Sequence, residues 1–338
     1  MGCNESGKED WETTIASVPG VLDVDSSNQL YFIEKLTFSL WKIDLNQPER
    51  NYTWQVVSSQ GEAQSFFARG LAIGRLPGED VLLSCGIYIP GNNNPSFSAL
   101  VALSTQEVNP GVELGSFVSS YRNTLLAIYG PLAGPSAMDS LTLNAATGVI
   151  RIFLIDEISW GNGNDKIFDS IKVFDFDYNE TAPAQSGFST AYTISSPGGA
   201  PCSDIFFRPS GLAVDPDDNA LYVVDRISNK LFRFSGIDGP SPSCDGEISS
   251  WGSGLEEQLF DPKGIAVLSG QMPLTDNIIY VADEGNARVA AFRWNGSAFT
   301  LFDTIPTPLD VPIDLAVDTA ENLWGAFPDI GRVDIIAK

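Results

Sequence analysis

The segment FRPSGLAVDPDDNALYVVDRISNKLFRF, residues 207–234, decides the fold. Three short runs rich in Leu, Val, Tyr and Phe are separated by two polar segments, and residues 216–219 have the composition of a tight turn. This pattern predicts an antiparallel meander of three strands. One such unit cannot bury both of its faces, so copies of it must stack on one another.

The unit recurs along the whole chain. Further copies begin near residues 260 and 312, and earlier ones near residues 19, 69 and 139. The intervals are about 50 residues, with two longer ones of about 70, which is typical of β-propeller blades that carry inserted loops. The sequence therefore predicts an all-β fold, a six-bladed β-propeller that forms a single domain over residues 11–338.

The repeat resembles a known family. Residues 209–215 (PSGLAVD), residues 221–225 (LYVVD) and the Asn229-Lys230-Leu231 step are similar to the NHL repeat. The likeness is good over residues 207–293, partial over 18–45 and 311–337, and faint over 68–190. It implies a six-bladed propeller and leaves the activity open, because propellers host unrelated functions.

The N-terminal segment has two expected parts. Residues 1–10 are polar and form a flexible tether, and residues 11–17 have the composition of a short strand. The last repeat ends after only three strands, and an open propeller would leave raw strand edges. We expect residues 11–17 to supply the fourth strand of the last blade and so to close the ring.

Composition excludes several kinds of function. The chain has 19 Lys and Arg against 43 Asp and Glu, a formal net charge of −24. This balance argues against binding to nucleic acid or to an anionic membrane surface, since both require a basic patch. The chain also has no His, which excludes Ser-His-Asp catalysis and His-ligated metals.

The four cysteines suggest an oxidising compartment. Cys202 and Cys244 lie in turn-rich segments on either side of one blade, so we expect a disulfide between them, with two free thiols as the alternative. Cys3 follows Gly2 and precedes a polar tail, as at the processed end of a bacterial lipoprotein. Alternatively, the pattern Met-Gly-x-x-x-Ser fits N-myristoylation, with Cys3 as a palmitoylation site. An incidental cysteine is the third possibility. We expect an extracytoplasmic monomer that meets a membrane only through a lipid at Cys3.

A metal site in the central channel is a further possibility. Lactonases of the related gluconolactonase and paraoxonase type hold calcium in a six-bladed channel with carboxylates and Asn, so the resemblance to the NHL repeat implies that such a site could exist here. The corresponding candidates are acids on innermost strands: Asp23, Asp139 and Asp314. The alternative is that they are solvated acids at the channel mouth. Amidating lyases of the NHL family rely on His ligands, so that activity is not supported.

A binding face is expected where second strands end and blades connect. Loops of this kind display recognition residues on a rigid scaffold. The candidates, with Trp160 as an aromatic anchor, are Glu34, Arg69, Asp156, Trp160, Asp225, Arg226, Asp283 and Arg288. For the acids that end second strands, the favoured role is to cap their own turns, and the other role is an acidic rim that recruits a cationic partner. The predicted function is a binding or scaffold module for a protein or a neutral or cationic ligand, and the alternative is a calcium-dependent lactonase-like hydrolase.

Overall fold

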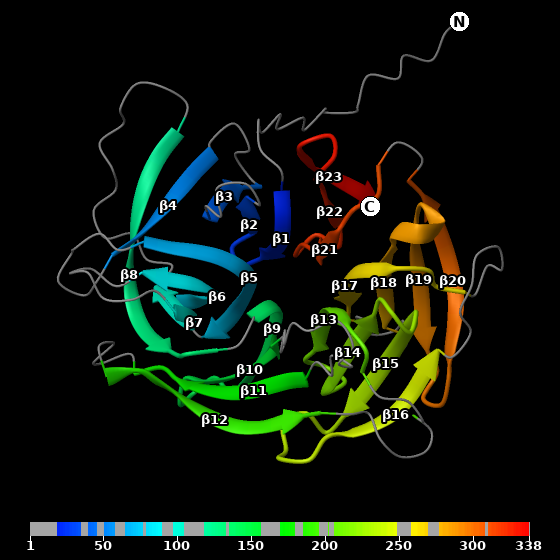
Figure 1. Ribbon diagram of the computed structural model, residues 1–338, viewed down its shortest axis with the longest axis horizontal. Coiled ribbons are helices and arrows are strands. Elements are labelled where there is room, and N and C mark those ends of the chain that lie inside the picture. Colours follow the sequence, from blue (N-terminus) through cyan, green and yellow to red (C-terminus); the bar gives the residue numbers. More distant parts are fainter. Residues whose placement is uncertain are drawn as a thin grey trace, which may run out of the picture.

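The computed structural model describes residues 19–34, 40–45, 51–57, 65–76, 79–89, 97–104, 118–132, 135–156, 170–179, 185–195, 202, 206–248, 258–269, 277–307 and 310–337. Its strands form antiparallel blades arranged in a ring (Figure 1), and the inner strands of the blades line a central channel. The predicted six-bladed β-propeller is thus confirmed. The tether, Cys3, the closing strand at residues 11–17 and Trp160 lie outside the described residues.

The first two blades share one sheet. Blade 1 contains β1 (Pro19–Val24), β2 (Gln29–Glu34), β3 (Leu40–Asp44) and β4 (Asn51–Val57), and blade 2 contains β5 (Ser65–Leu76), β6 (Glu79–Ile89), β7 (Phe97–Ser104) and β8 (Val118–Tyr129). The outer strands β4 and β8 pair in parallel, which joins the blades into eight strands. Residues 123–129 form the second half of this outer strand β8.

The other four blades are separate sheets. Blade 3 contains β9 (Pro135–Asn144), β10 (Val149–Asp156), β11 (Ser170–Asp177) and β12 (Gly187–Ile194), and blade 4 contains β13 (Pro209–Asp215), β14 (Ala220–Asp225), β15 (Lys230–Ser235) and β16 (Ser243–Ile248). Blade 5 contains β17 (Pro262–Leu268), β18 (Ile278–Asp283), the 3-10 turn η2 (Glu284–Asn286), β19 (Arg288–Trp294) and β20 (Phe299–Pro306). Blade 6 has three described strands, β21 (Asp314–Val317), β22 (Leu323–Phe327) and β23 (Arg332–Ala337).

The hydrophobic core is divided among the interfaces between blades. Each of the six neighbouring pairs of blades encloses its own cluster of buried apolar side chains. The cluster between the last and first blades joins Leu22 and Val24 of β1 to Ala316 and Trp324. This burial closes the ring by packing, because apolar area removed from water stabilises each interface in proportion to its size.

The acid at the end of the first strand caps the turn that follows it. Asp25 Oδ1 accepts hydrogen bonds from the backbone N–H groups of Ser27 at 2.9 Å and Gln29 at 2.8 Å. Asp318 does the same for Ala320 and Asn322, both at 2.9 Å. This capping explains why the repeat favours Asp there.

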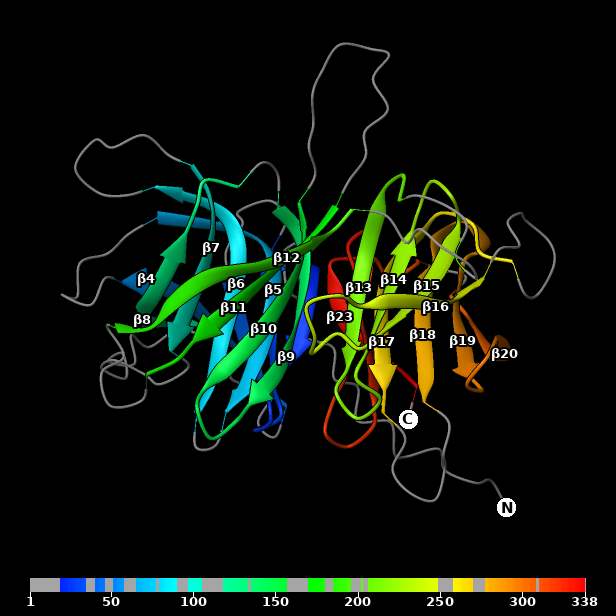
Figure 2. The same ribbon diagram turned by 90° about the horizontal axis from the view of Figure 1, so that it is seen from below.

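The propeller has two faces, visible edge-on in Figure 2. We call the hairpin face the one that carries the turns from first to second strands, such as residues 216–219. We call the connector face the opposite one, which carries the turns from second to third strands and the connections between blades. The described candidates Asp156, Asp225, Arg226, Asp283 and Arg288 lie where second strands end and third strands begin, toward the connector face.

Candidate functional site

The central channel holds a cavity of about 460 Å³. Its walls come from the inner strands of all six blades, which supply apolar side chains such as Leu71, Ile73, Leu212 and Ile265. A cavity of this size with mixed polar and apolar walls is of the kind that binds small molecules in other proteins.

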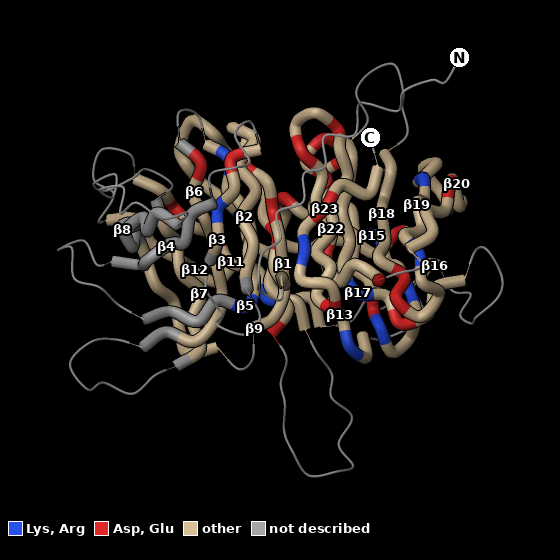
Figure 3. Tube along the Cα trace, turned by 90° about the horizontal axis from the view of Figure 1, so that it is seen from above, with Lys and Arg blue, Asp and Glu red and all other residues tan. Residues whose placement is uncertain are grey.

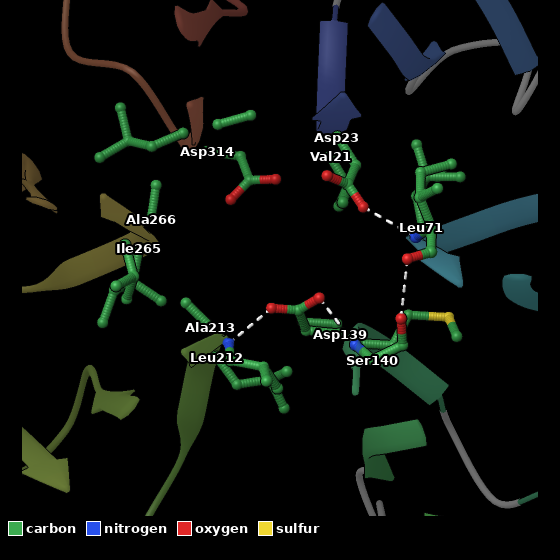
Figure 4. Close-up of a pocket in the computed structure, with 18 of the residues that line it drawn as sticks. Val21, Asp23, Leu71, Asp139, Ser140, Leu212, Ala213, Ile265, Ala266 and Asp314 are labelled. Atoms are coloured by element: carbon green, nitrogen blue, oxygen red, sulfur yellow. Dashed lines mark hydrogen bonds between the residues drawn. The ribbon is translucent and has the colours of Figure 1, made fainter. Parts of the chain in front are cut away.

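Three carboxylates from three different blades share this cavity. Asp23 lies on β1, Asp139 on β9 and Asp314 on β21, and all three line the cavity. Figure 4 shows their carboxylates pointing toward a common space between the inner strands. The structure therefore brings together the three acids that the sequence singled out as channel candidates.

Each carboxylate also joins its own blade to the next one. Asp23 accepts a hydrogen bond from the backbone N–H of Ile73 at 2.8 Å, and Asp139 accepts one from Val214 at 2.6 Å. Asp314 accepts one from Leu22 at 2.9 Å, across the boundary between the last and first blades. The inner strand of a blade is a sheet edge with unpaired N–H groups, so these acids satisfy donors that would otherwise lack a partner.

A close approach of strands surrounds one of these acids. A Cβ atom placed on Gly264 of β17 would lie 2.4 Å from the Cα atom of Asp314. Glycine at this position therefore lets β17 pack against the start of β21. A larger residue would push Asp314 away from its place in the channel.

Burial changes the acidity of two channel carboxyls. Removal from water, together with the charge of Asp139, raises the pKa of Asp23 to about 7, although Arg75 and backbone hydrogen bonds oppose the rise. Burial also raises the pKa of Asp139 to about 6, against hydrogen bonds from Val214 and Ser140. The channel therefore holds carboxyls that titrate near neutral pH, which is a property of many functional sites.

Among the described residues that line the cavity, Arg75 is the one base, and it was not predicted from the sequence as a site residue. Its Nη2 atom lies 3.5 Å from the carbonyl oxygen of Val24, and its positive charge lowers the pKa of both Asp23 and Asp139. The sequence does hold a signal for Arg75, because it is a single base that follows the mostly apolar residues 71–74 of an inner strand. Three acids still outnumber this one base around the cavity.

The channel acids do not form a ready coordination sphere. Among the described residues, no group of three or more Asp, Glu, Cys or His side chains is close enough to share one metal ion. The backbone bonds of Asp23 and Asp139 also occupy lone pairs that a cation would need. Calcium binding by these residues thus requires ligands beyond the three carboxylates.

Three acids of the expected binding face are buried. The carboxylates of Asp156, Asp225 and Asp283 are fully buried. Asp225 accepts four backbone hydrogen bonds, from Phe207 at 2.7 Å, Arg208 at 2.9 Å, and residues 227 and 228 at 3.0 and 2.9 Å. Asp225 therefore holds loops in place, as in the capping role considered for these acids, and none of the three buried carboxylates presents its charge at the surface.

The remaining acids and bases of that face are mostly engaged as well. Asp156 pairs with Lys172, and Arg288 Nε donates to Asp283 at 2.8 Å. Arg226 forms two hydrogen bonds to Asp261 of the neighbouring blade, at 2.9 and 3.1 Å. Of the other candidates, Arg69 is exposed, and Glu34 ends β2 with a side chain outside the described set. Binding by this face stays a prediction.

The expected disulfide is present. Cys202 and Cys244 are bonded to each other, with Cα atoms 6.0 Å apart. The bond ties the segment before blade 4 to the outer strand β16. Cys85 of β6 is a buried free thiol, and burial raises its pKa to about 12.

Comparison with known proteins supports the fold alone. No family model matches the chain, and no curated protein matches it. A solved structure described as a luciferin-regenerating enzyme matches 93% of this chain and 85% of its own, with 13% identity and a TM-score of 0.51. The architecture is shared. At that identity the likeness carries no information about the substrate.

Within the described residues, no helix is long and apolar enough to cross a membrane.

Proposed function

We propose that this protein is a binding propeller whose central channel takes a small cationic or neutral ligand. The observation that carries the proposal is the position of Asp23, Asp139 and Asp314, whose carboxylates face one cavity from three blades. The described residues of the cavity wall carry one positive charge, the guanidinium of Arg75. A ligand with one positive charge would offset the mutual repulsion of these acids.

The walls indicate the rest of the ligand. Leu71, Leu212 and Ile265 supply apolar surface, so an apolar or aromatic group next to the cation would be stabilised by burial. A carboxylate ligand would face three acids and is disfavoured. The expected order of affinity for molecules of one shape is amine, then alcohol, then carboxylate.

A matched set of probes tests this order. Benzylamine, benzyl alcohol and benzoate share a ring and differ in charge, and isothermal titration calorimetry measures their affinities directly. We expect benzylamine to bind best and Asp139→Asn to weaken it, because the substitution removes one negative charge. Equal affinity for all three probes, or preference for benzoate, would contradict the proposal.

A calcium-dependent lactonase-like hydrolase is the second candidate. It is favoured by the all-oxygen character of three acids in one cavity, since calcium takes oxygen ligands. This candidate predicts stoichiometric calcium that resists dialysis and a melting temperature that falls with a chelator. Metal analysis of the purified protein separates it from the binding propeller, which predicts neither result.

An extracytoplasmic location completes the proposal. The Cys202–Cys244 disulfide supports it, because such bonds persist in oxidising compartments. We further propose that the blades are of the NHL type and that a lipid at Cys3 tethers the domain to a membrane. Mass spectrometry of the N-terminal peptide from the native source tests the lipid, and an unmodified Cys3 would exclude it.

A further inference from the structure

Exposed apolar side chains gather on the connector face. Among the described residues, six large apolar side chains are exposed, and five lie near this face: Ile128, Phe207, Ile227, Phe260 and Ile330. The sixth, Phe302, lies on the outer strand β20. Single exposed apolar residues are ordinary, whereas a group on one face indicates an interaction site.

Three of these residues lie at neighbouring connections of blades 4 and 5. Phe207, Ile227 and Phe260 are 39%, 57% and 43% exposed. The backbone N–H groups of Phe207 and Ile227 donate to the same carboxylate, that of Asp225. We call these three residues the connector patch.

Hydrogen bonds between blades fix the third member beside the other two. Asn229 Oδ1 accepts a bond from the N–H of Asp261 at 2.7 Å, and Arg226 binds the carboxylate of Asp261. The carbonyl of Phe260 accepts a bond from Gly285 at 2.8 Å. The patch therefore has a rigid backbone under exposed side chains, and little ordering is needed on binding.

Near the connector patch, one basic side chain has no ion-pair partner among the described residues. Arg226 is paired with Asp261, and Lys263 with Glu284. Arg208 is exposed, and within the described part of the chain its guanidinium has no ion-pair or hydrogen-bond partner. Lys and Arg are few along the trace (Figure 3), so a free guanidinium next to exposed Phe207 is unusual in this acidic chain. Aromatic residues and Arg are the types enriched at protein interfaces.

We propose that the connector patch binds an apolar peptide segment that bears a single carboxylate. The apolar side chains of the segment would cover Phe207, Ile227 and Phe260, and its carboxylate would pair with Arg208. One negative charge suits this protein better than several, because the formal net charge of −24 repels a strongly acidic partner. The proposal is independent of any ligand in the channel.

Three peptide libraries test the proposal. Pooled hexapeptides with three apolar residues and one Glu are incubated with the immobilised protein, alongside pools in which Gln or Lys replaces the Glu. Bound peptides are quantified by mass spectrometry. We expect the Glu pool to be retained most and the Lys pool least. Equal retention of the three pools, preference for the Lys pool, or no retention of any pool would overturn the proposal.

Variants then locate the binding. Ile227→Lys should reduce retention of the Glu pool about tenfold or more, the effect of losing a central interface side chain. Arg208→Glu should reverse the preference between the Glu and Lys pools. Phe302→Ser is the matched control, since Phe302 is also exposed, and it should change nothing.

Two results from the variants would contradict the assignment. Retention that Ile227→Lys and Phe302→Ser reduce equally would place the site elsewhere. A dimer in sedimentation experiments that disappears with Ile227→Lys would show that a second copy of the chain covers the patch, and it would also overturn the proposal. Melting temperatures confirm that the variants are folded, as expected for exposed positions.

Discussion

Replacing Asp23 with Asn should alter how stability depends on pH. The folded protein holds the Asp23 proton more tightly than the unfolded chain, since burial raises the pKa from 3.8 to about 7. The contribution of the protonated carboxyl is therefore complete below pH 4 and is lost as the pH rises to about 7. Asparagine cannot ionise and keeps one oxygen for the N–H groups of Val24 or Ile73.

The size of the effect follows from the pKa difference. One pKa unit corresponds to about 1.4 kcal/mol, so the full difference is worth about 4 kcal/mol. Screening by solvent and the shared titration with Asp139 reduce this free energy, so we expect the stability difference between wild type and variant to change by about 2 kcal/mol over the pH range. At low pH the wild type should be the more stable by about 1 kcal/mol, the worth of one lost backbone hydrogen bond. Above pH 7 the variant should equal or exceed it.

Urea unfolding followed by tryptophan fluorescence measures this difference. The free energies of unfolding of wild type and Asp23→Asn are compared at intervals from pH 4 to pH 8. Asp139→Asn serves as a second arm, with a smaller change confined below about pH 6, where its own carboxyl titrates. A difference between wild type and Asp23→Asn that stays constant over the whole range would refute the reasoning. A difference of opposite slope would show that the backbone hydrogen bonds outweigh burial.

Three further predictions concern stability. Arg151 pairs with Asp175, and its Nη1 atom donates hydrogen bonds to the carbonyls of residues 237, 238 and 239 of blade 4 at 3.1, 2.6 and 2.9 Å. Arg151→Met should therefore lower the free energy of unfolding in urea by about 3 kcal/mol. A loss below about 0.5 kcal/mol would show that water takes over the hydrogen bonds of the guanidinium. Reducing the Cys202–Cys244 bond, which closes a separation of 42 residues, should cost about 3–4 kcal/mol, and Cys202→Ser with Cys244→Ser should no longer respond to reductant. Deleting residues 1–18 should lower the melting temperature markedly while deleting 1–9 should not, if residues 11–17 complete the last blade; equal melting temperatures would exclude that role.

The sequence predicted the blades well because their signals are local. Short apolar strands separated by polar turns mark the inner hairpins, and in blades 1, 4 and 6 an Asp also ends or directly follows the first strand, at Asp25, Asp215 and Asp318. The parallel pairing of β4 with β8 was not predictable, since it depends on two strands about 70 residues apart and on no turn between them.

The candidate site was predictable only in part. The carboxylates of Asp23, Asp139 and Asp314 could be assigned to inner strands, and their meeting in one cavity follows from ring closure. The burial of Asp225 was not evident, because a carboxylate that caps loops and one that faces solvent occupy the same place in the repeat. The exposure of Phe207 and Ile227 could not be predicted either, since apolar residues at strand ends are more often covered.

Proton release on ligand binding tests the central claim most directly. With a pKa of about 7, Asp23 is partly protonated at neutral pH in the free protein. A cation in the channel favours the ionised carboxylates and must therefore expel protons. Calorimetric titration of benzylamine in buffers of different ionisation enthalpy counts these protons. We predict a fractional release near pH 7 that diminishes toward pH 8, where benzylamine is still protonated, and that is reduced in Asp23→Asn. Binding without proton release, or with release that Asp23→Asn leaves unchanged, would contradict a cation site at the channel carboxylates.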